Sequence, residues 1–149
     1  AAAGRPAGSV KVQAAAPAHI GEIGDCRDRT RWFPALVSNH VVDLVNKYPR
    51  DELPESLTGY VRDRTGYDYL HHAEVGSSNA GFVGDDVTDR LCVLGSVDDH
   101  LVKLRDLAAA GVDQFNIYLM NGDEEQVLEI YARDIIPKLR NVAAATTPG

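Results

Sequence analysis

The sequence has 149 residues, enough for one domain with a substantial core, and its 44% hydrophobic and 25% charged residues are typical of a globular chain. The formal net charge of −7 disfavours general nucleic-acid binding, because an acidic surface repels the phosphate backbone. This charge does not exclude a phosphate-bearing ligand held locally by backbone amides. No apolar run has the length of a bilayer-crossing helix, so we expect no contact with a membrane.

The two cysteines, Cys26 and Cys92, match neither a disulfide framework nor a zinc ligand set. Two free thiols in a reducing cytoplasm are the expectation. The first ten residues, AAAGRPAGSV, have neither the basic nor the apolar region of a secretion signal. We expect this segment to come from the middle of a longer chain or from a trimmed product.

The first third of the chain predicts one strand and one long helix. Valines and alanines predict a strand near residues 9–16, which Pro17 would end because proline lacks a backbone donor. Apolar residues at three- and four-residue spacing predict a helix over residues 25–48 with one apolar face. Pro34 lies inside this range, and it would either kink the helix or mark its true start.

Residues 49–84 differ from their surroundings in being rich in Pro, Gly, Ser, Asp and Tyr. A short helix over residues 54–64 is expected, and the rest is expected to form a long loop. Four tyrosines between residues 48 and 69 argue against disorder, since disordered segments are poor in aromatic residues. A long ordered loop in a compact domain is usually functional.

Residues 85–94 predict a short helix, and a second helix is expected over residues 97–110. Ser96 is placed as the N-cap of the second helix, with Asp99 completing a variant of the capping box. Gly111 follows the helix, where a left-handed backbone conformation costs glycine least.

Residues 114–120, QFNIYLM, predict a strand buried on both faces, and the Asn121-Gly122 turn then leads into an acidic helix start over residues 123–140. Pro137 would bend the last turn of this helix. Helices that alternate with buried strands predict a parallel sheet with right-handed crossovers. Two parallel strands cannot cover their own edges, so we expect the other strands on another chain or a missing segment. A self-sufficient α/β domain would instead need strands within residues 49–84.

Several segments together resemble a known family. They are RWFPALVSNHVVDLVNKY, LTGYVRDRTGYDYLHH, FVGDDVTDRLCVLGSVDDHLVKLRDLAAAGVDQFNIYLM and YARDIIPKLR. The chain resembles the C-terminal part of the luciferase-like monooxygenase superfamily, and within it the F420-dependent oxidoreductases related to methylenetetrahydromethanopterin reductase. The resemblance covers residues 9–140 and is most specific over residues 89–120.

The resemblance implies a (β/α)8 TIM barrel about twice as long as this chain. The strand near residues 9–16 would be the penultimate barrel strand, residues 114–120 would be the last, and residues 49–84 would be an insertion over the barrel mouth. The implied reaction transfers a hydride between the coenzyme and a small organic substrate. The coenzyme is either FMN, which when reduced reacts with oxygen, or the deazaflavin F420, which does not; the nearest subgroup favours F420.

Active sites of this fold lie at the carboxyl ends of the strands, which selects Pro17, Ala18 and Asn121 as candidate coenzyme contacts. His19 is the candidate catalytic residue, as a hydrogen-bond donor to a ring or substrate carbonyl or as an acid near neutral pH. The structural alternatives are a loop histidine bonded to backbone and an asparagine that serves only the turn.

Arg31 could clamp a substrate carboxylate or phosphate while Trp32 covers its ring. The alternative is a helix-surface arginine beside a buried tryptophan. Tyr67, Tyr69 and His71 lie in the insertion and could touch substrate, or they could pack on the barrel rim or a second subunit. The two adjacent histidines of GYDYLHH lack the spacing of a helical metal pair, so we predict no metal site.

The glycine-rich phosphate cradle of the family is not recognisable here and would lie in the missing half, so we expect this chain alone to be inactive. An incomplete barrel would expose apolar helix faces and strand edges, which predicts association with the remaining part of the barrel and a homo-oligomer. The alternative function is a non-catalytic partner or truncated paralogue that retains the barrel helices for assembly.

Overall fold

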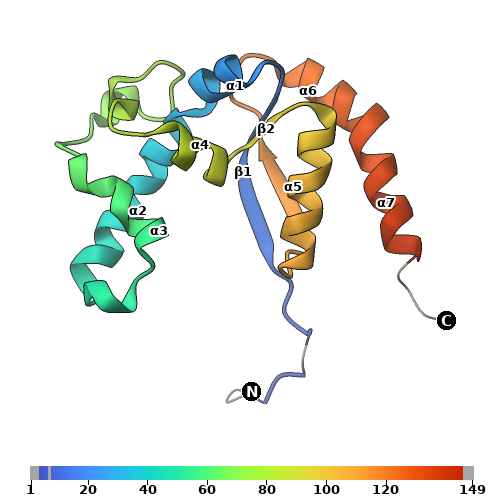
Figure 1. The fold of residues 1–149 in the computed structure, drawn as a ribbon, viewed down its shortest axis with the longest axis horizontal. Helices are drawn as coiled ribbons and strands as arrows, with labels where there is room; N and C mark the ends of the chain where they lie inside the picture. The colour runs from blue at the N-terminus through green and yellow to red at the C-terminus, as the bar shows by residue number, and fades with distance from the viewer. Residues whose placement is uncertain (1–3, 7, 146–149) are drawn as a thin grey trace.

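The computed structural model describes residues 4–6 and 8–145 and has mixed α/β architecture. Its centre is a parallel sheet of three strands in the order β2-β1-β3. These strands are β1 (Gln13–Ile20), β2 (Val93–Gly95) and β3 (Gln114–Tyr118). Figure 1 shows β1 and β3 side by side in the middle of the molecule, with helices on both sides of them. The prediction of an α/β fold with parallel strands is confirmed.

Strand β1 was expected at residues 9–16, and this range is wrong because the strand continues through Pro17 to Ile20. Residues 13–17 of β1 pair with β3, and residues 18–20 pair with β2 on the opposite edge. Pro17 therefore lies where the strand changes partners, a position that tolerates the missing N–H. Proline did not end the strand because tertiary pairing, rather than local preference, sets its limits.

Strand β2 was not predicted, since its residues were assigned to the end of a helix over 85–94. That helix, α4, ends earlier and spans Asp85–Leu91. The three residues of β2 are buried because they pair with the end of β1. A run this short has no periodicity that separates strand from helix. Strand β3 also ends two residues earlier than the predicted 114–120.

The predicted helix over residues 25–48 is two helices, α1 (Ile23–Thr30) and α2 (Trp32–Lys47). The break falls at Arg31, and Pro34 lies in the first turn of α2. This agrees with the interpretation of Pro34 as a sign of a helix start, because a first-turn N–H has no partner within the helix.

The excursion over residues 49–84 is ordered and holds one short helix, α3 (Glu55–Thr58), which continues as a 3₁₀ turn over Gly59–Asp63. This pair corresponds to the helix expected over residues 54–64. The Tyr60 hydroxyl donates to the Pro34 carbonyl at 3.2 Å, and its ring stacks on Phe82 at 6.1 Å between centroids. Three further 3₁₀ turns span Arg50–Glu52, Tyr69–His71 and Ser78–Ala80.

Helix α5 (Val97–Ala109) follows its sequence signals closely and ends one residue before the predicted 110. The capping box is confirmed: Ser96 Oγ accepts from the Asp99 amide at 3.2 Å, and Asp99 Oδ2 accepts from the Ser96 amide at 2.8 Å. Gly111 has a φ of +98°, the left-handed conformation predicted there.

We expect Ser96→Ala to lower the free energy of unfolding by about 1 kcal/mol, because the amide at Asp99 loses its acceptor. Urea unfolding followed by circular dichroism measures this loss. Ser78→Ala is the matched control, since Ser78 is exposed and begins only a 3₁₀ turn. An equal loss in both variants would contradict the capping role.

The last predicted helix, over residues 123–140, is interrupted. It comprises α6 (Glu124–Ile130), a π-helical turn over Tyr131–Ile135, and α7 (Ile136–Ala145). Pro137 was expected to bend the last turn, but the irregular segment precedes it. Proline cannot donate to the carbonyl four residues earlier and its ring collides with that carbonyl, which explains a wider turn on its N-terminal side.

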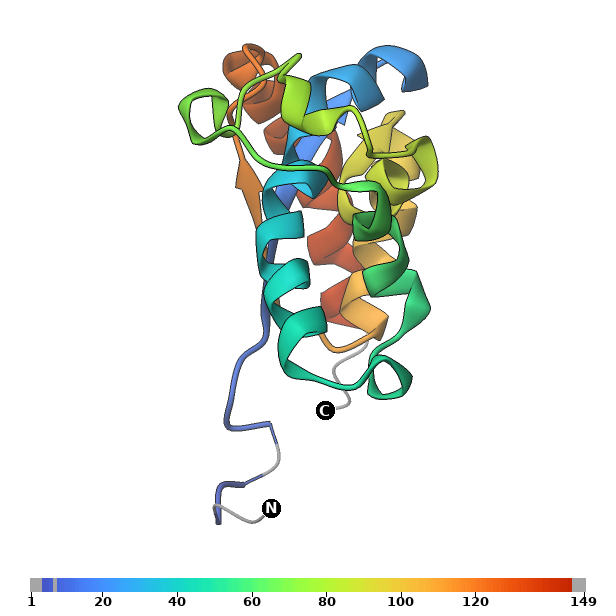
Figure 2. The ribbon, with the colours of Figure 1, turned by 90° about the vertical axis from the view of Figure 1, so that its left-hand side faces the viewer.

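Two apolar clusters anchor the helices to the sheet. Ala18 and Val93 pack with α5 and the α6–α7 segment, whereas Ala16 and Leu94 pack with α1 and α2. Figure 2 shows the ribbon from the side of α2 and the excursion. Within the described residues, no helix combines the length and apolar character that a membrane crossing requires.

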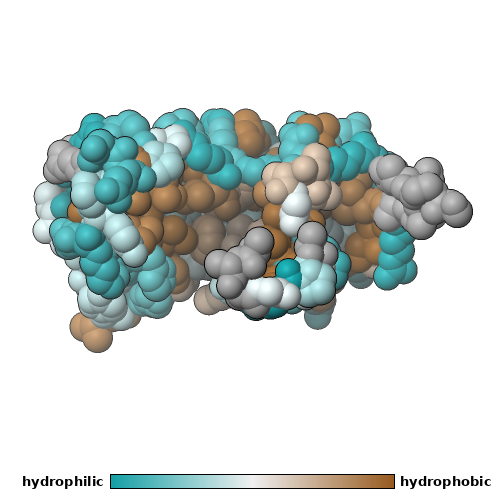
Figure 3. All heavy atoms as spheres, turned by 90° about the horizontal axis from the view of Figure 1, so that it is seen from below, coloured by the Kyte–Doolittle hydropathy of each residue, from teal (hydrophilic) through white to brown (hydrophobic). Residues whose placement is uncertain are grey.

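One face of the sheet is open to solvent at the start of β1 and along β3, whereas Pro17 and His19, further along the same face of β1, are buried. Gln13 and Ala15 of β1 are exposed, as are Gln114, Asn116 and Tyr118 of β3. Side-chain amides form a row on this face, from Gln13 to Gln114 at 3.1 Å and from Gln114 to Asn116 at 2.7 Å. Figure 3, seen from below, shows apolar side chains gathered along the middle of the molecule.

Candidate functional site

His19 lies next to the carboxyl end of the central strand and is only 6% exposed. Its Nε2 lies 3.2 Å from Asp25 Oδ2 of α1. Its Nδ1 is in close contact with Asp123 Oδ2 at the start of α6. This contact between Nδ1 and Asp123 Oδ2 is not aligned as a hydrogen bond. Nδ1 is buried and has no hydrogen-bond partner. One imidazole is thus held between carboxylates from two different helices.

The backbone of His19 is also held in place by buried side chains. Its carbonyl oxygen lies 3.1 Å from His100 Nε2 and accepts from Cys26 Sγ at 3.3 Å. Because a carbonyl can only accept, His100 must carry its proton on Nε2. His100 Nδ1 then accepts from the Tyr131 hydroxyl, 2.9 Å away. This network fixes the position of His19 from below the site.

Burial sets the protonation of the supporting groups. It lowers the pKa of His100 and raises the pKa of Tyr131, so both side chains stay neutral near pH 7. It also raises the pKa of Cys26, which keeps that thiol protonated as the donor to His19. The supporting layer is therefore neutral, and the charges of the site lie on its solvent side.

We expect the free energy of unfolding to fall as the pH is lowered from 7 to 5, in part through His100. In the unfolded chain His100 binds a proton near its ordinary pKa of about 6.5, whereas burial lowers its pKa in the folded state. The stabilising contribution is thus present above pH 6.5 and is lost as the pH falls.

His100→Gln should flatten this dependence, since glutamine can still donate and accept but does not titrate. The comparison is made by urea unfolding at pH 7, 6 and 5. His71, whose pKa is raised by Asp68, acts in the opposite direction and is present in both proteins. Parallel curves for the wild type and the variant would contradict the prediction.

A cleft of about 780 Å³ opens beside His19 at this end of the sheet. Five carboxylates and a single arginine, Arg29, line it. Arg29 donates to Asp25 at 2.8 Å, and this bond holds the pKa of Asp25 below its usual value. The carboxylates that line the cleft are Asp25, Asp123, Glu124, Glu125 and Glu129. The cleft is therefore strongly acidic.

The predicted coenzyme contacts near His19 are buried in the protein. Asn121 is 4% exposed; its Oδ1 accepts from Trp32 Nε1 at 3.1 Å, and its Nδ2 donates to the Ala18 carbonyl at 3.5 Å. Pro17 is fully buried, and Ala18 has no exposed surface. None of these three residues lines the cleft, and the polar groups of the Asn121 side chain are bonded within the protein.

Arg31 and Trp32, predicted to hold substrate, do not line the cleft. Arg31 donates to the Val83 carbonyl at 2.8 Å and to Asp85 at 2.6 Å, so it ties α1 to the end of the excursion. Trp32 is 3% exposed and belongs to the core between the sheet and α2. Arg31 is thus half-buried at the break between α1 and α2, beside a buried tryptophan.

Tyr67, Tyr69 and His71 form a cluster of their own in the excursion. The rings of Tyr67 and Tyr69 lie 5.0 Å apart, and His71 Nδ1 lies 2.8 Å from Asp68. The Tyr67 hydroxyl contacts His72 Nδ1 at 2.8 Å. None of these residues lines the cleft beside His19.

Sequence and structure comparisons gave no relatives. No family model, curated protein or solved structure matches the chain. Among the described residues, no group of three or more His, Cys, Asp or Glu side chains is arranged to hold a metal ion. The geometry of the site therefore carries the functional argument.

The rule that active sites follow strand ends selected His19, which lies within β1 one residue before its end, and it did not select the two carboxylates beside it. Asp123 lies two residues beyond Asn121, directly after the turn that was predicted. Asp25 lies in the first turn of α1, and the same rule would have selected it had β1 been extended to Ile20. His100 is the fourth residue of α5. No sequence signal identifies it as part of the site, because only packing brings it under His19.

Proposed function

We propose that this chain is the C-terminal part of a luciferase-like, flavin- or deazaflavin-dependent oxidoreductase that transfers a hydride between its coenzyme and a small organic substrate. The observation that carries the proposal is His19, held at the strand ends between Asp25 and Asp123. A histidine between carboxylates is suited to general acid–base catalysis.

The proposed (β/α)8 barrel is supported by the sheet. β1 and β3 are parallel neighbours, as the penultimate and last strands of a barrel would be. Within the described residues, the outer edge of β3 has no strand partner, and β2 covers only residues 18–20 of the other edge of β1. Further strands could pair at these edges. On the edge of β1 opposite to β3, the preceding barrel strand and β2 would then both pair with β1.

Exposed apolar surface also supports the proposal that the rest of the barrel lies outside this chain. A groove of about 600 Å³ between α5, β3 and α7 is lined by Leu104, Leu107, Phe115 and Leu139. Met120 is 48% exposed and Tyr118 is 43% exposed beside the open face of the sheet. An apolar groove beside exposed apolar side chains is a feature of many interaction sites. We propose that the remaining barrel strands and helices cover it.

In the proposed mechanism, the side chains around His19 hold a proton and transfer it to the substrate. The Asp123 carboxylate lies against Nδ1, and Nε2 would exchange a proton with a substrate oxygen when its contact with Asp25 opens. Arg29 holds Asp25 toward the cleft wall. The coenzyme supplies the hydride chemistry when bound, and the protein supplies position and electrostatics.

The phosphate group that either coenzyme carries does not fit this cleft. Five carboxylates would repel it, and Arg29 is already paired with Asp25. The N-termini of α1 and α5 are capped by their own Glu22 and Ser96 side chains, so their amides are not free to hold an anion. We therefore assign the phosphate contacts to the part of the barrel outside this chain.

The second candidate function is a non-catalytic partner or truncated paralogue. It is favoured by the burial of Pro17, Ala18 and Asn121, which leaves the predicted coenzyme contacts without a group that faces a ligand. On this proposal the apolar surfaces serve assembly, and the His19 network serves stability.

Native purification distinguishes the two candidates. The material that carries this chain is isolated without denaturant, its intact mass is measured, and FMN and F420 are titrated while their fluorescence is followed. The oxidoreductase proposal predicts a longer polypeptide or a companion chain and saturable quenching by one coenzyme. A single stable species of this chain that quenches neither coenzyme would overturn it in favour of the non-catalytic partner.

A further inference from the structure

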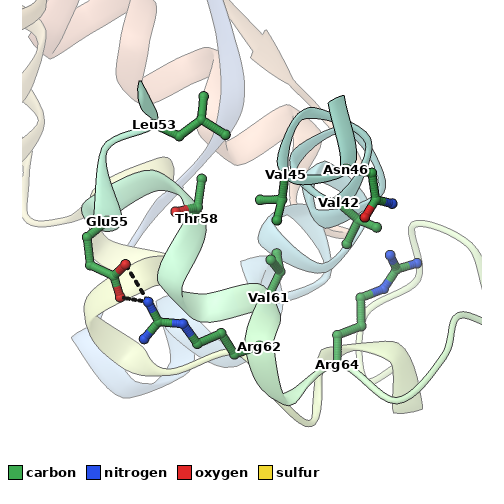
Figure 4. A pocket seen from close by; sticks show the side chains of 9 residues that line it. All are labelled: Val42, Val45, Asn46, Leu53, Glu55, Thr58, Val61, Arg62 and Arg64. Carbon is green, nitrogen blue, oxygen red and sulfur yellow. Dashed lines mark hydrogen bonds and ion pairs between the residues drawn. The ribbon is translucent and has the colours of Figure 1, made fainter. Parts of the chain in front are cut away.

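A second cavity lies far from His19 in sequence, between α2 and the segment from α3 to Arg64. Its volume is about 300 Å³. Figure 4 shows side chains from both segments directed into it. Four of its lining residues are aliphatic: Val42, Val45, Leu53 and Val61. The other five lining residues are polar or charged, so the cavity has both aliphatic and polar walls and the size of a small ligand site.

The mouth of this cavity carries two arginines with different surroundings. Arg62 forms an ion pair with Glu55, so these two charges neutralise each other. Arg64 donates through Nη2 to Asn39 Oδ1, and its Cζ lies 5.2 Å from the centre of the Tyr67 ring. No carboxylate whose side chain the structure describes lies within ion-pair distance of Arg64. One positive charge at the cavity is left without a described counter-charge.

The Nε atom of Arg64 is buried and has no hydrogen-bond partner. Buried donors in folded proteins are almost always paired, so an unpaired N–H on a residue that lines a cavity indicates a place for an acceptor nearby. An arginine fork matches the two oxygens of a carboxylate in geometry and charge. The aliphatic walls beside it match a compact apolar group.

We propose that this cavity binds a small organic carboxylate, with its carboxylate on Arg64 and its apolar tail among the valines of α2 and the α3 segment. Inorganic phosphate fits less well, because it would leave the aliphatic walls in contact with a hydrated ion. The site is separate from the cleft beside His19, and the proposal does not depend on the oxidoreductase assignment.

Benzoate and benzyl alcohol are suitable probes, since they share a ring and differ in charge. We expect saturable benzoate binding at one site per chain in equilibrium dialysis, with benzyl alcohol at least tenfold weaker. Arg64→Gln should weaken benzoate binding at least tenfold. Arg133→Gln, an exposed arginine paired with Asp134 on the π-helical turn, should leave it unchanged.

Val45→Phe is a second test that keeps Arg64 and fills the cavity, and it should abolish benzoate binding while circular dichroism shows the chain folded. Three results would overturn the proposal. The first is the absence of saturable benzoate binding. The second is equal binding of benzoate and benzyl alcohol, which would indicate an apolar docking surface. The third is unchanged benzoate binding in both Arg64→Gln and Val45→Phe.

Discussion

If the proposed oxidoreductase function holds, we expect His19→Gln to lower the rate of hydride transfer by about 10²–10⁴-fold in the proposed assembly. Glutamine is close in size to histidine and can still donate a hydrogen bond to Asp25, but its amide does not act as an acid or a base. The loss should fall on kcat, and coenzyme affinity should stay near that of the wild type. Stopped-flow absorbance of the coenzyme measures both quantities.

The control for this prediction is His40→Gln. His40 is an exposed histidine on α2, so its replacement removes the same chemical group without touching the cleft. Its rate should match that of the wild type. If His19→Gln keeps the full rate, His19 is a structural residue, and the proton-transfer role proposed for it fails.

Ile135→Ala is expected to lower the free energy of unfolding by about 2–5 kcal/mol. Ile135 has no exposed surface and lies in the cluster that joins the sheet to α5 and the α6–α7 segment. Removing its outer carbons leaves a cavity that rigid neighbours cannot fill, because helices hold it on two sides. A loss of this size is a large fraction of the stability of an ordinary domain.

Ile136→Ala is the matched control, because Ile136 is the next residue and is 38% exposed. Both variants remove the same atoms from the same helical segment, so the difference between them isolates burial. Urea unfolding at one protein concentration measures both. Similar losses would mean that the end of α6 and the start of α7 do not pack as the structure places them.

Local signals predicted the helices whose ends depend on nearby residues. The start of α5 follows from Ser96 and Asp99, and its end from Gly111, because capping involves contacts within a few residues. The break before α2 was indicated by Pro34 for the same reason. The acidic start of α6 also follows from neighbouring residues, since the helix dipole favours carboxylates there.

Strand limits were predicted poorly because they depend on partners distant in the sequence. β1 continues past Pro17 since β2 is available to pair with Ala18 to Ile20. β2 exists only because β1 lies beside it, and its three residues alone resemble the end of a helix. In both cases, pairing across more than 70 residues decided the structure.

The sequence by itself determined the class of the fold and the alternation of helices with parallel strands, and it made His19 a candidate through the strand-end rule. Only the tertiary structure decided what surrounds that histidine. Asp25, Asp123 and His100 come from three helices, and side chains converge in this way only after the chain has packed. Periodicity and capping report short-range preferences, whereas a site built from several elements depends on long-range packing.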